Sequence, residues 1–162
     1  MRVAVAGPPS SGNYMLKSIL GACGCDFVKV CHGNRAETLK EMDFVVVLVR
    51  GANAWIESGN EHNRFKNDFA DVHWLGKAST HHEAHQVTYR AYFKAILKYD
   101  IPFAIVSYES LITDTDDTIK KLCEWIGLTF PGWENMPSEN KKGQALKPFD
   151  ANDKYRNLVS KQ

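Results

Sequence analysis

The chain has 162 residues, 44% hydrophobic and 24% charged, a composition typical of a globular domain that excludes a fibrous or intrinsically disordered chain. Twenty Lys and Arg against nineteen Asp and Glu leave a net charge of +1, which does not favour a nucleic acid or an anionic membrane as partner. The longest apolar run, residues 44–49, is too short to cross a bilayer. We therefore expect a single cytoplasmic domain over residues 1–162.

Strand and helix patterns alternate along the chain. In chain order they predict a strand over 2–6, a helix over 13–21, a strand over 26–31, a short helix over 36–42, a strand over 44–49, mixed helical pieces over 52–78, a long helix over 80–99, a strand over 102–107, a helix over 113–127 and a last helix over 152–159. The unbroken β-branched run in 44–49 is typical of a strand buried on both faces of a parallel sheet.

This alternation predicts an α/β fold of the P-loop type, with a mainly parallel sheet and helices on both faces. Ligands of such sheets bind beyond the carboxyl ends of the strands. We therefore expect the functional residues just after Ala6, Cys31, Val49 and Val106.

Several side chains are expected in the core. They are Met15, Ile19 and Leu20 in the first helix, Val87, Ala91, Ile96 and Leu97 in the long helix, and Trp125 in the helix over 113–127. The four cysteines, Cys23, Cys25, Cys31 and Cys123, are expected to be free buried thiols in a reducing compartment, because no common metal or redox spacing joins them.

Residues 7–12, Gly-Pro-Pro-Ser-Ser-Gly, have the G-x-x-x-x-G spacing of a loop that binds phosphate between a strand and a helix. A nucleoside triphosphatase would continue with Lys and then Ser or Thr, which hold phosphate and Mg²⁺, but this chain continues with Asn13 and Tyr14. Taken alone, the segment fits either an anion site or a simple strand-to-helix turn.

Further motifs follow the other predicted strands. Arg50 follows the third strand, with Ser58 eight positions on, and Tyr108 and Glu109 follow the fourth strand; the next helix closes in the sequence Trp-Ile-Gly-Leu over 125–128. In this order and spacing the chain resembles the sulfotransferases that use 3′-phosphoadenosine 5′-phosphosulfate (PAPS) as sulfuryl donor. The loop of that family has the form G-x-P-(R/K)-S-G-T-T.

The resemblance implies a nucleotide site. The residues around the 5′-phosphosulfate would be Pro9, Ser10, Ser11, Gly12, Asn13 and Tyr14, and those around the rest of the nucleotide would be Arg50, Ser58, Tyr108, Lys141, Lys142 and Gly143. In the family the residues that match Arg50 and Ser58 bind the 3′-phosphate. Three positions depart from the family's loop, because Ser10 stands in place of a basic residue and Asn13 and Tyr14 in place of two threonines.

The resemblance also implies catalytic residues. Lys29-Val30-Cys31-His32 lies where cytosolic members carry Lys-x-His, offset by one residue, so His32 is the expected general base and Lys29 an expected charge near the leaving phosphate. Glu83 is the second candidate base. The acceptor would be a hydroxyl or an amine of a small molecule, a carbohydrate or a peptide, the product nucleotide would be adenosine 3′,5′-bisphosphate, and no metal is required.

Other interpretations remain open. Arg50 fits an ion pair with Glu57 or Glu109 as well as a phosphate, and for Glu109 we favour a structural role. His81 and His85 lie one helical turn apart, but Gln86 stands where an H-E-x-x-H zinc motif needs histidine. The two alternative functions are a nucleotide or small-molecule kinase of the same architecture and a nucleotide-binding module without catalysis.

Overall fold

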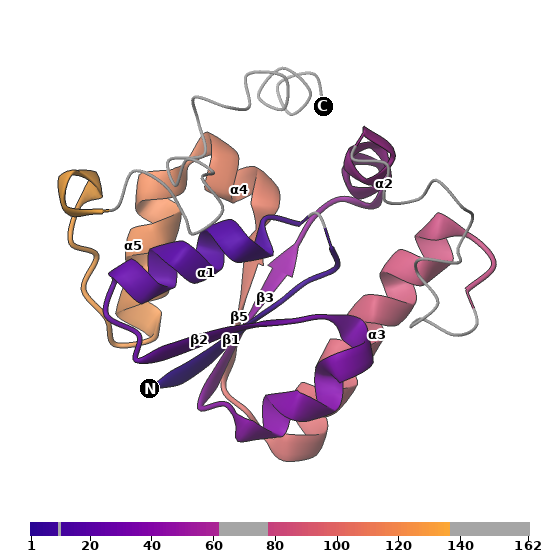
Figure 1. Cartoon of the computed structure of the whole chain (residues 1–162), viewed down its shortest axis with the longest axis horizontal. Coiled ribbons are helices and arrows are strands. Elements are labelled where there is room, and N and C mark those ends of the chain that lie inside the picture. Colours follow the sequence, from indigo (N-terminus) through magenta and orange to yellow (C-terminus); the bar gives the residue numbers. More distant parts are fainter. Residues whose placement is uncertain (10, 62–77, 137–162) are drawn as a thin grey trace.

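The computed structural model describes residues 1–9, 11–61 and 78–136. Within them a single sheet contains β1 (Arg2–Ala6), β2 (Phe27–Cys31), β3 (Phe44–Val49) and β5 (Phe103–Ser107). The strands are all parallel and lie in the order β2-β1-β3-β5 (Figure 1). Their carboxyl ends therefore lie at one edge of the sheet, as the sequence predicts.

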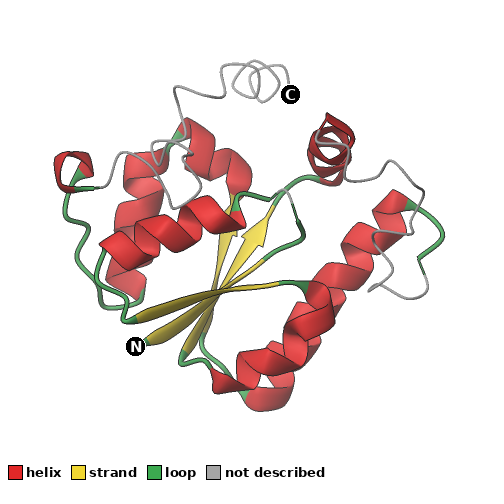
Figure 2. Cartoon of the chain, viewed as in Figure 1, coloured by secondary structure: helices red, strands yellow, loops and turns green. Residues whose placement is uncertain are grey.

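Helices cover both faces of this sheet (Figure 2). The helices of the described residues are α1 (Asn13–Ala22), the 3₁₀ helix η1 (Gly33–Glu41), α2 (Ala52–Glu61), α3 (His81–Tyr99), α4 (Tyr108–Thr113), α5 (Thr115–Trp125) and the short 3₁₀ helix η3 (Trp133–Asn135), of which α1, α4 and α5 cover one face and η1 and α3 the other. The predicted α/β fold with a parallel sheet is confirmed. No helix in the described ranges is both long and apolar enough to span a membrane.

The alternation of β-strand side chains divides the core into two layers. Val46 and Leu48 of β3 point to one face, where α1, α4 and α5 pack, whereas Val45 and Val47 point to the other face, against η1 and α3. Each layer contains fully buried aliphatic residues from its helices, such as Leu16 of α1 on one face and Leu39 of η1 on the other. Burial on both faces explains why β3 is apolar at every position.

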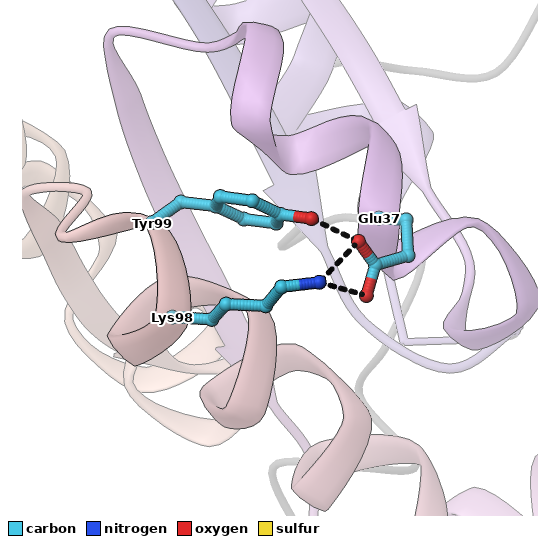
Figure 3. A network of polar contacts seen from close by, with 3 residues as sticks. All are labelled: Glu37, Lys98 and Tyr99. Carbon is cyan, nitrogen blue, oxygen red and sulfur yellow. Dashed lines mark hydrogen bonds and ion pairs between the residues drawn. The ribbon is translucent and has the colours of Figure 1, made fainter.

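Figure 3 shows how η1 is joined to the end of α3. The carboxylate of Glu37 accepts hydrogen bonds from Lys98, whose Nζ lies 3.2 Å from Oε2, and from the hydroxyl of Tyr99. The bond from Tyr99, followed by that from Lys98, lowers the pKa of Glu37. Because the pair is exposed, its effect on stability is small.

Two predictions about the core are wrong, and one helix is missing from the predicted elements. Leu97 is 75% exposed and Trp125 is 70% exposed, because each lies off the buried face of its helix. The segment that begins at Tyr108 is helix α4, which the side chain of Ser107 caps by accepting from the N–H of Ser110. The predicted helix over 152–159 lies outside the described residues.

The other core predictions fare better. In α1 the buried apolar residues are Leu16, Ile19 and Leu20, while Met15 packs at the margin. In α3, Ile96 is buried as predicted, and Val87 and Ala91 are half-buried. All four cysteines are buried and their thiols are free.

Candidate functional site

Segments that are distant in sequence meet at the carboxyl edge of the sheet. The N–H of Gly7, after β1, donates to the carbonyl oxygen of Cys31 at the end of β2, 3.4 Å away. The N–H of Gly51, after β3, donates to the carboxylate of Glu109, after β5, at 3.0 Å. The segments after β1 and β2, and those after β3 and β5, are thus joined in two pairs at this edge, where the sequence predicts the functional residues.

The two glycines that bound the loop are required by geometry. A Cβ on Gly7 would lie 2.4 Å from Oδ1 of Asn13 and 3.0 Å from the carbonyl oxygen of Leu48. Gly12 has a φ of 81°, in the left-handed region that other residues rarely adopt, and it is the N-cap of α1. The loop therefore turns sharply into α1 and runs close to β3.

Asn13 holds this loop from inside. Its buried side-chain amide donates to the carbonyl oxygens of Gly7, at 3.0 Å, and of Pro8, at 2.9 Å. Its Oδ1 is buried and accepts no hydrogen bond from the described residues. At this position the P-loop of a triphosphatase has lysine, so the amide occupies the place of a positive charge.

The beginning of α1 has the features of an anion site. Gly12 offers no side chain to cap the helix, and the first turn contains no acidic residue. The first N–H groups of a helix have no partner within the helix, and its dipole attracts negative charge there. The preceding Ser11 is fully buried beside this turn. These N–H groups are the chemistry that a phosphate needs.

Arg50 and Tyr108 lie directly beside this loop. Arg50 is only 2% exposed, and its guanidinium carbon lies 4.3 Å from the centre of the Tyr108 ring, a cation–π contact. Gly12 also lies against this ring, since a Cβ there would come within 2.8 Å of Cε2 of Tyr108. The end of the loop, the arginine after β3 and the tyrosine after β5 therefore form one cluster.

Glu109 takes the structural role that the sequence favours. Its Oε1 accepts from the N–H of Gly51 and its Oε2 from the hydroxyl of Ser107, at 2.9 Å. The carboxylate thus joins the segment after β3 to the end of β5.

Helix α2 covers the loop. Trp55 is fully buried, and its indole N–H donates to the carbonyl oxygen of Pro9 at 2.6 Å. Ser58, three residues further along α2, is 4% exposed and lies on the same side of the helix. Ser58 therefore faces the protein interior, and Trp55 contacts the glycine loop directly.

The two expected catalytic residues differ in position. His32 directly follows β2, and its Nδ1 lies 3.5 Å from the carbonyl oxygen of Gly7, so the imidazole lies beside the loop. Lys29 lies within β2, where it pairs with Ala4 two residues before the edge. Its side chain is on the same face of the sheet as Cys31. Burial raises the pKa of the Cys31 thiol, and the positive charge of Lys29 partly opposes this rise.

Glu83 caps α3. Its carboxylate accepts from the N–H of Ser79 at 2.6 Å and from the Ser79 hydroxyl at 2.7 Å, while the side chain of Thr80 accepts from the N–H of Glu83. This is a capping arrangement typical of helix N-termini. The bonds from Ser79 lower the pKa of Glu83, which makes it a weaker base.

Two residues of α3 contact the backbone of Arg50, and the sequence analysis considered His85 only as a metal ligand and did not single out Tyr89. Nε2 of His85 lies 2.8 Å from the carbonyl oxygen of Arg50, and the hydroxyl of Tyr89 accepts from the N–H of Arg50 at 3.2 Å. Burial lowers the pKa of His85 and raises that of Tyr89 to about 12, so both are uncharged near neutral pH. Their spacing of one helical turn is the signal that was available in the sequence.

The remaining predicted residues are distributed as follows. Tyr14 is 44% exposed on α1, whereas Ser10 and the three residues Lys141, Lys142 and Gly143 lie outside the described part of the chain. Among the described residues, no group of three or more His, Cys, Asp or Glu side chains is arranged to hold a metal ion.

Comparison with models of protein families gives no match for this chain, and comparison with curated proteins gives no significant match.

Proposed function

We propose that the protein is a sulfotransferase of the PAPS-dependent type. The observation that carries this proposal is the cluster of Gly12, Tyr108 and Arg50, because three motifs that are widely separated in sequence lie in contact. A buried arginine beside an uncapped helix N-terminus offers two sites of positive potential. A nucleotide with phosphates at both its 3′ and 5′ positions carries two negatively charged groups, one for each of these positive sites.

In this proposal the two phosphate groups of the nucleotide bind different elements. The N–H groups at the start of α1 hold the 5′-phosphosulfate, and the same N–H groups stabilise the charge that grows on the departing phosphate. Arg50 binds the 3′-phosphate through its planar guanidinium, and the hydroxyl of Ser58 donates a further hydrogen bond. The observations that fit this division are the uncapped start of α1 and the burial of Arg50 and Ser58.

PAPS supplies a sulfuryl group bound to a phosphate that is a good leaving group. His32 takes the proton from the hydroxyl or amine of the acceptor as the new bond to sulfur forms. The bond between sulfur and the bridging oxygen breaks, and its electron pair stays with the phosphate. We further propose that the acceptor is a small molecule, a carbohydrate or a peptide, and that the protein acts in the cytoplasm, where its buried thiols stay reduced.

The binding step is tested by titrating the protein with adenosine 3′,5′-bisphosphate and with adenosine 5′-monophosphate. The wild type is expected to prefer the bisphosphate, and Arg50→Ala is expected to remove most of that preference, by about 2–4 kcal/mol. Ser58→Ala is expected to cost about 1 kcal/mol. Arg90→Ala, which removes an exposed arginine on α3, is the control. Equal weakening of both nucleotides in Arg50→Ala would show that Arg50 is structural.

The chemical step is tested by transfer of labelled sulfate from PAPS to a panel of alcohols and amines. His32→Ala is expected to abolish transfer while the affinity for the bisphosphate stays within about twofold, because a base acts on the acceptor. Unchanged transfer in this variant removes His32 from the mechanism.

A nucleotide-binding module without catalysis is the second candidate. The observation in its favour is Asn13, whose amide bonds the loop carbonyls at a position where the resemblance implies threonine. Binding of the bisphosphate with no transfer to any acceptor supports this module. Stabilisation by ATP with Mg²⁺, but not by the bisphosphate, supports a kinase instead.

A further inference from the structure

The end of β3 extends beyond its neighbour β1. Ala6, the last residue of β1, pairs with Val47, and the chain then leaves the sheet as the glycine loop. The N–H of Val45 donates to the carbonyl oxygen of Pro102, which directly precedes β5. By strand alternation, the backbone groups of Leu48 and Arg50 therefore point toward the side of β1. These groups need partners from outside the sheet.

Tyr89 supplies those partners. Its hydroxyl accepts from the N–H of Arg50 at 3.2 Å and donates to the carbonyl oxygen of Leu48 at 3.0 Å. In a parallel ladder one residue of the neighbouring strand makes this pair of bonds. The tyrosine hydroxyl therefore takes the place of the residue that β1 would contribute if it continued.

His85 holds the other backbone group of Arg50. The carbonyl oxygen of Arg50 can only accept, so the bond of 2.8 Å places a proton on Nε2 of His85. The imidazole is fixed by ring contacts with Trp55, at 5.4 Å between centroids, and with Tyr89, at 4.9 Å. Both the N–H and the C=O of Arg50 are thus held by side chains one turn apart on α3.

We propose that Tyr89 and His85 are positioning residues, which fix the backbone of Arg50 so that its guanidinium meets the 3′-phosphate of the bound nucleotide. This inference rests on the proposed function. A bidentate contact with phosphate tolerates little displacement of the guanidinium. Because Arg50 lies beyond the last pair of β1 and β3, the side chains of α3, rather than the ladder between those strands, keep its Cα in place.

Tyr89→Phe tests this role, because it keeps the ring and removes only the hydroxyl. Titration is expected to show about a fivefold to tenfold loss of affinity for adenosine 3′,5′-bisphosphate and less than about a twofold loss for adenosine 5′-monophosphate. The matched control is Tyr92→Phe, one turn further along α3, whose hydroxyl donates to the carbonyl oxygen of Cys31 instead. That control is expected to leave the ratio of the two affinities unchanged.

A second pair of variants, at His85, tests the same role even if Tyr89→Phe does not fold. His85→Phe removes the donor to Arg50 and is expected to lower the same ratio, whereas His85→Gln, which places an amide N–H near the position of Nε2, is expected to restore it. Thermal melting of each variant without nucleotide measures the purely structural effect.

The outcomes separate the two proposals. If Arg50→Ala removes the preference for the bisphosphate but Tyr89→Phe and His85→Phe keep it, the positioning role is overturned and the proposed function stands. Equal loss of both nucleotides in Tyr89→Phe, or the same selective loss in Tyr92→Phe, also overturns the positioning role. A wild type without any preference for the bisphosphate overturns the proposed function, and the positioning role with it.

Discussion

The indole N–H of Trp55 donates a hydrogen bond to the carbonyl oxygen of Pro9, 2.6 Å away, and so fastens α2 to the glycine loop. The indole is fully buried, and the contact spans 46 positions in sequence. Removal of the donor would leave the Pro9 carbonyl without this partner, which costs more than the hydrogen bond itself contributes. This bond therefore couples the loop to the helix that carries Ser58.

Trp55→Phe is expected to lower the free energy of unfolding by about 2–4 kcal/mol, because the bond to Pro9 is lost and the smaller ring leaves a cavity. Urea denaturation measures this change. Trp125→Phe is the matched control, since Trp125 is 70% exposed and its replacement is expected to cost less than about 0.5 kcal/mol. Equal losses in the two variants would contradict a special role for the contact of Trp55.

The substitution of glycine by alanine is expected to have opposite effects on stability at Gly12, the N-cap of α1, and at Gly21 within that helix. Gly12→Ala places a Cβ at a φ of 81° and within 2.8 Å of the Tyr108 ring, so we expect a loss of about 2–3 kcal/mol of stability. Gly21→Ala adds a Cβ with no atom within 4 Å, in a helix, and is expected to stabilise by about 0.5 kcal/mol. Thermal melting of both variants checks the sign. A stabilised Gly12→Ala variant would contradict the left-handed turn at the start of α1.

The strands could be predicted from the sequence because their signal is local. The apolar runs at 2–6 and 44–49 coincide with β1 and β3, and the glycine loop is followed by α1 as expected. Helix α4 was missed because Tyr108 and Glu109 directly continue an apolar strand. The N-cap signal of Ser107 is weak beside that run.

The buried faces of α3 and α5 were harder to predict, because large apolar residues also lie on exposed faces. In α3 the buried stripe includes Thr88 and Tyr92, whereas Leu97 lies on the opposite side. The contacts of His85 and Tyr89 with the backbone of Arg50 depend on how α3 crosses the end of β3. That tertiary relationship has no local signature in the sequence.

His85 predicts how stability depends on pH. Burial lowers its pKa below the ordinary value of 6.5, so the unfolded chain binds a proton at a higher pH than the folded one. The stability is therefore complete above about pH 6.5 and falls as the pH drops toward the lower folded pKa. Melting temperatures between about pH 7.5 and 5.5 should decrease for the wild type and decrease less for His85→Gln.

Other titrating groups with shifted pKa values contribute little to this pH dependence between about pH 7.5 and 5.5. The carboxylates with lowered pKa values, Asp26, Glu37 and Glu83, have ordinary values of 3.8 to 4.5, so most of their effect lies below this pH range. An identical pH dependence in the wild type and in His85→Gln would contradict a neutral, half-buried His85.

Asn13→Ala separates the two phosphate sites that we propose. The substitution removes both donors to the carbonyl oxygens of Gly7 and Pro8, which are buried, so we expect a loss of about 2–3 kcal/mol of stability. It also loosens the loop at the start of α1, where the 5′-phosphate is proposed to bind. Both the monophosphate and the bisphosphate should therefore bind more weakly by the same factor, with their affinity ratio preserved, whereas Arg50→Ala should change that ratio.

Asn135→Ala removes a comparable but exposed bond, from Nδ2 to the carbonyl oxygen of Pro131, and controls for the loss of an asparagine side chain. A change of the ratio in Asn13→Ala would mean that the loop also contacts the 3′-phosphate, and the assignment of one phosphate to each element would then be wrong.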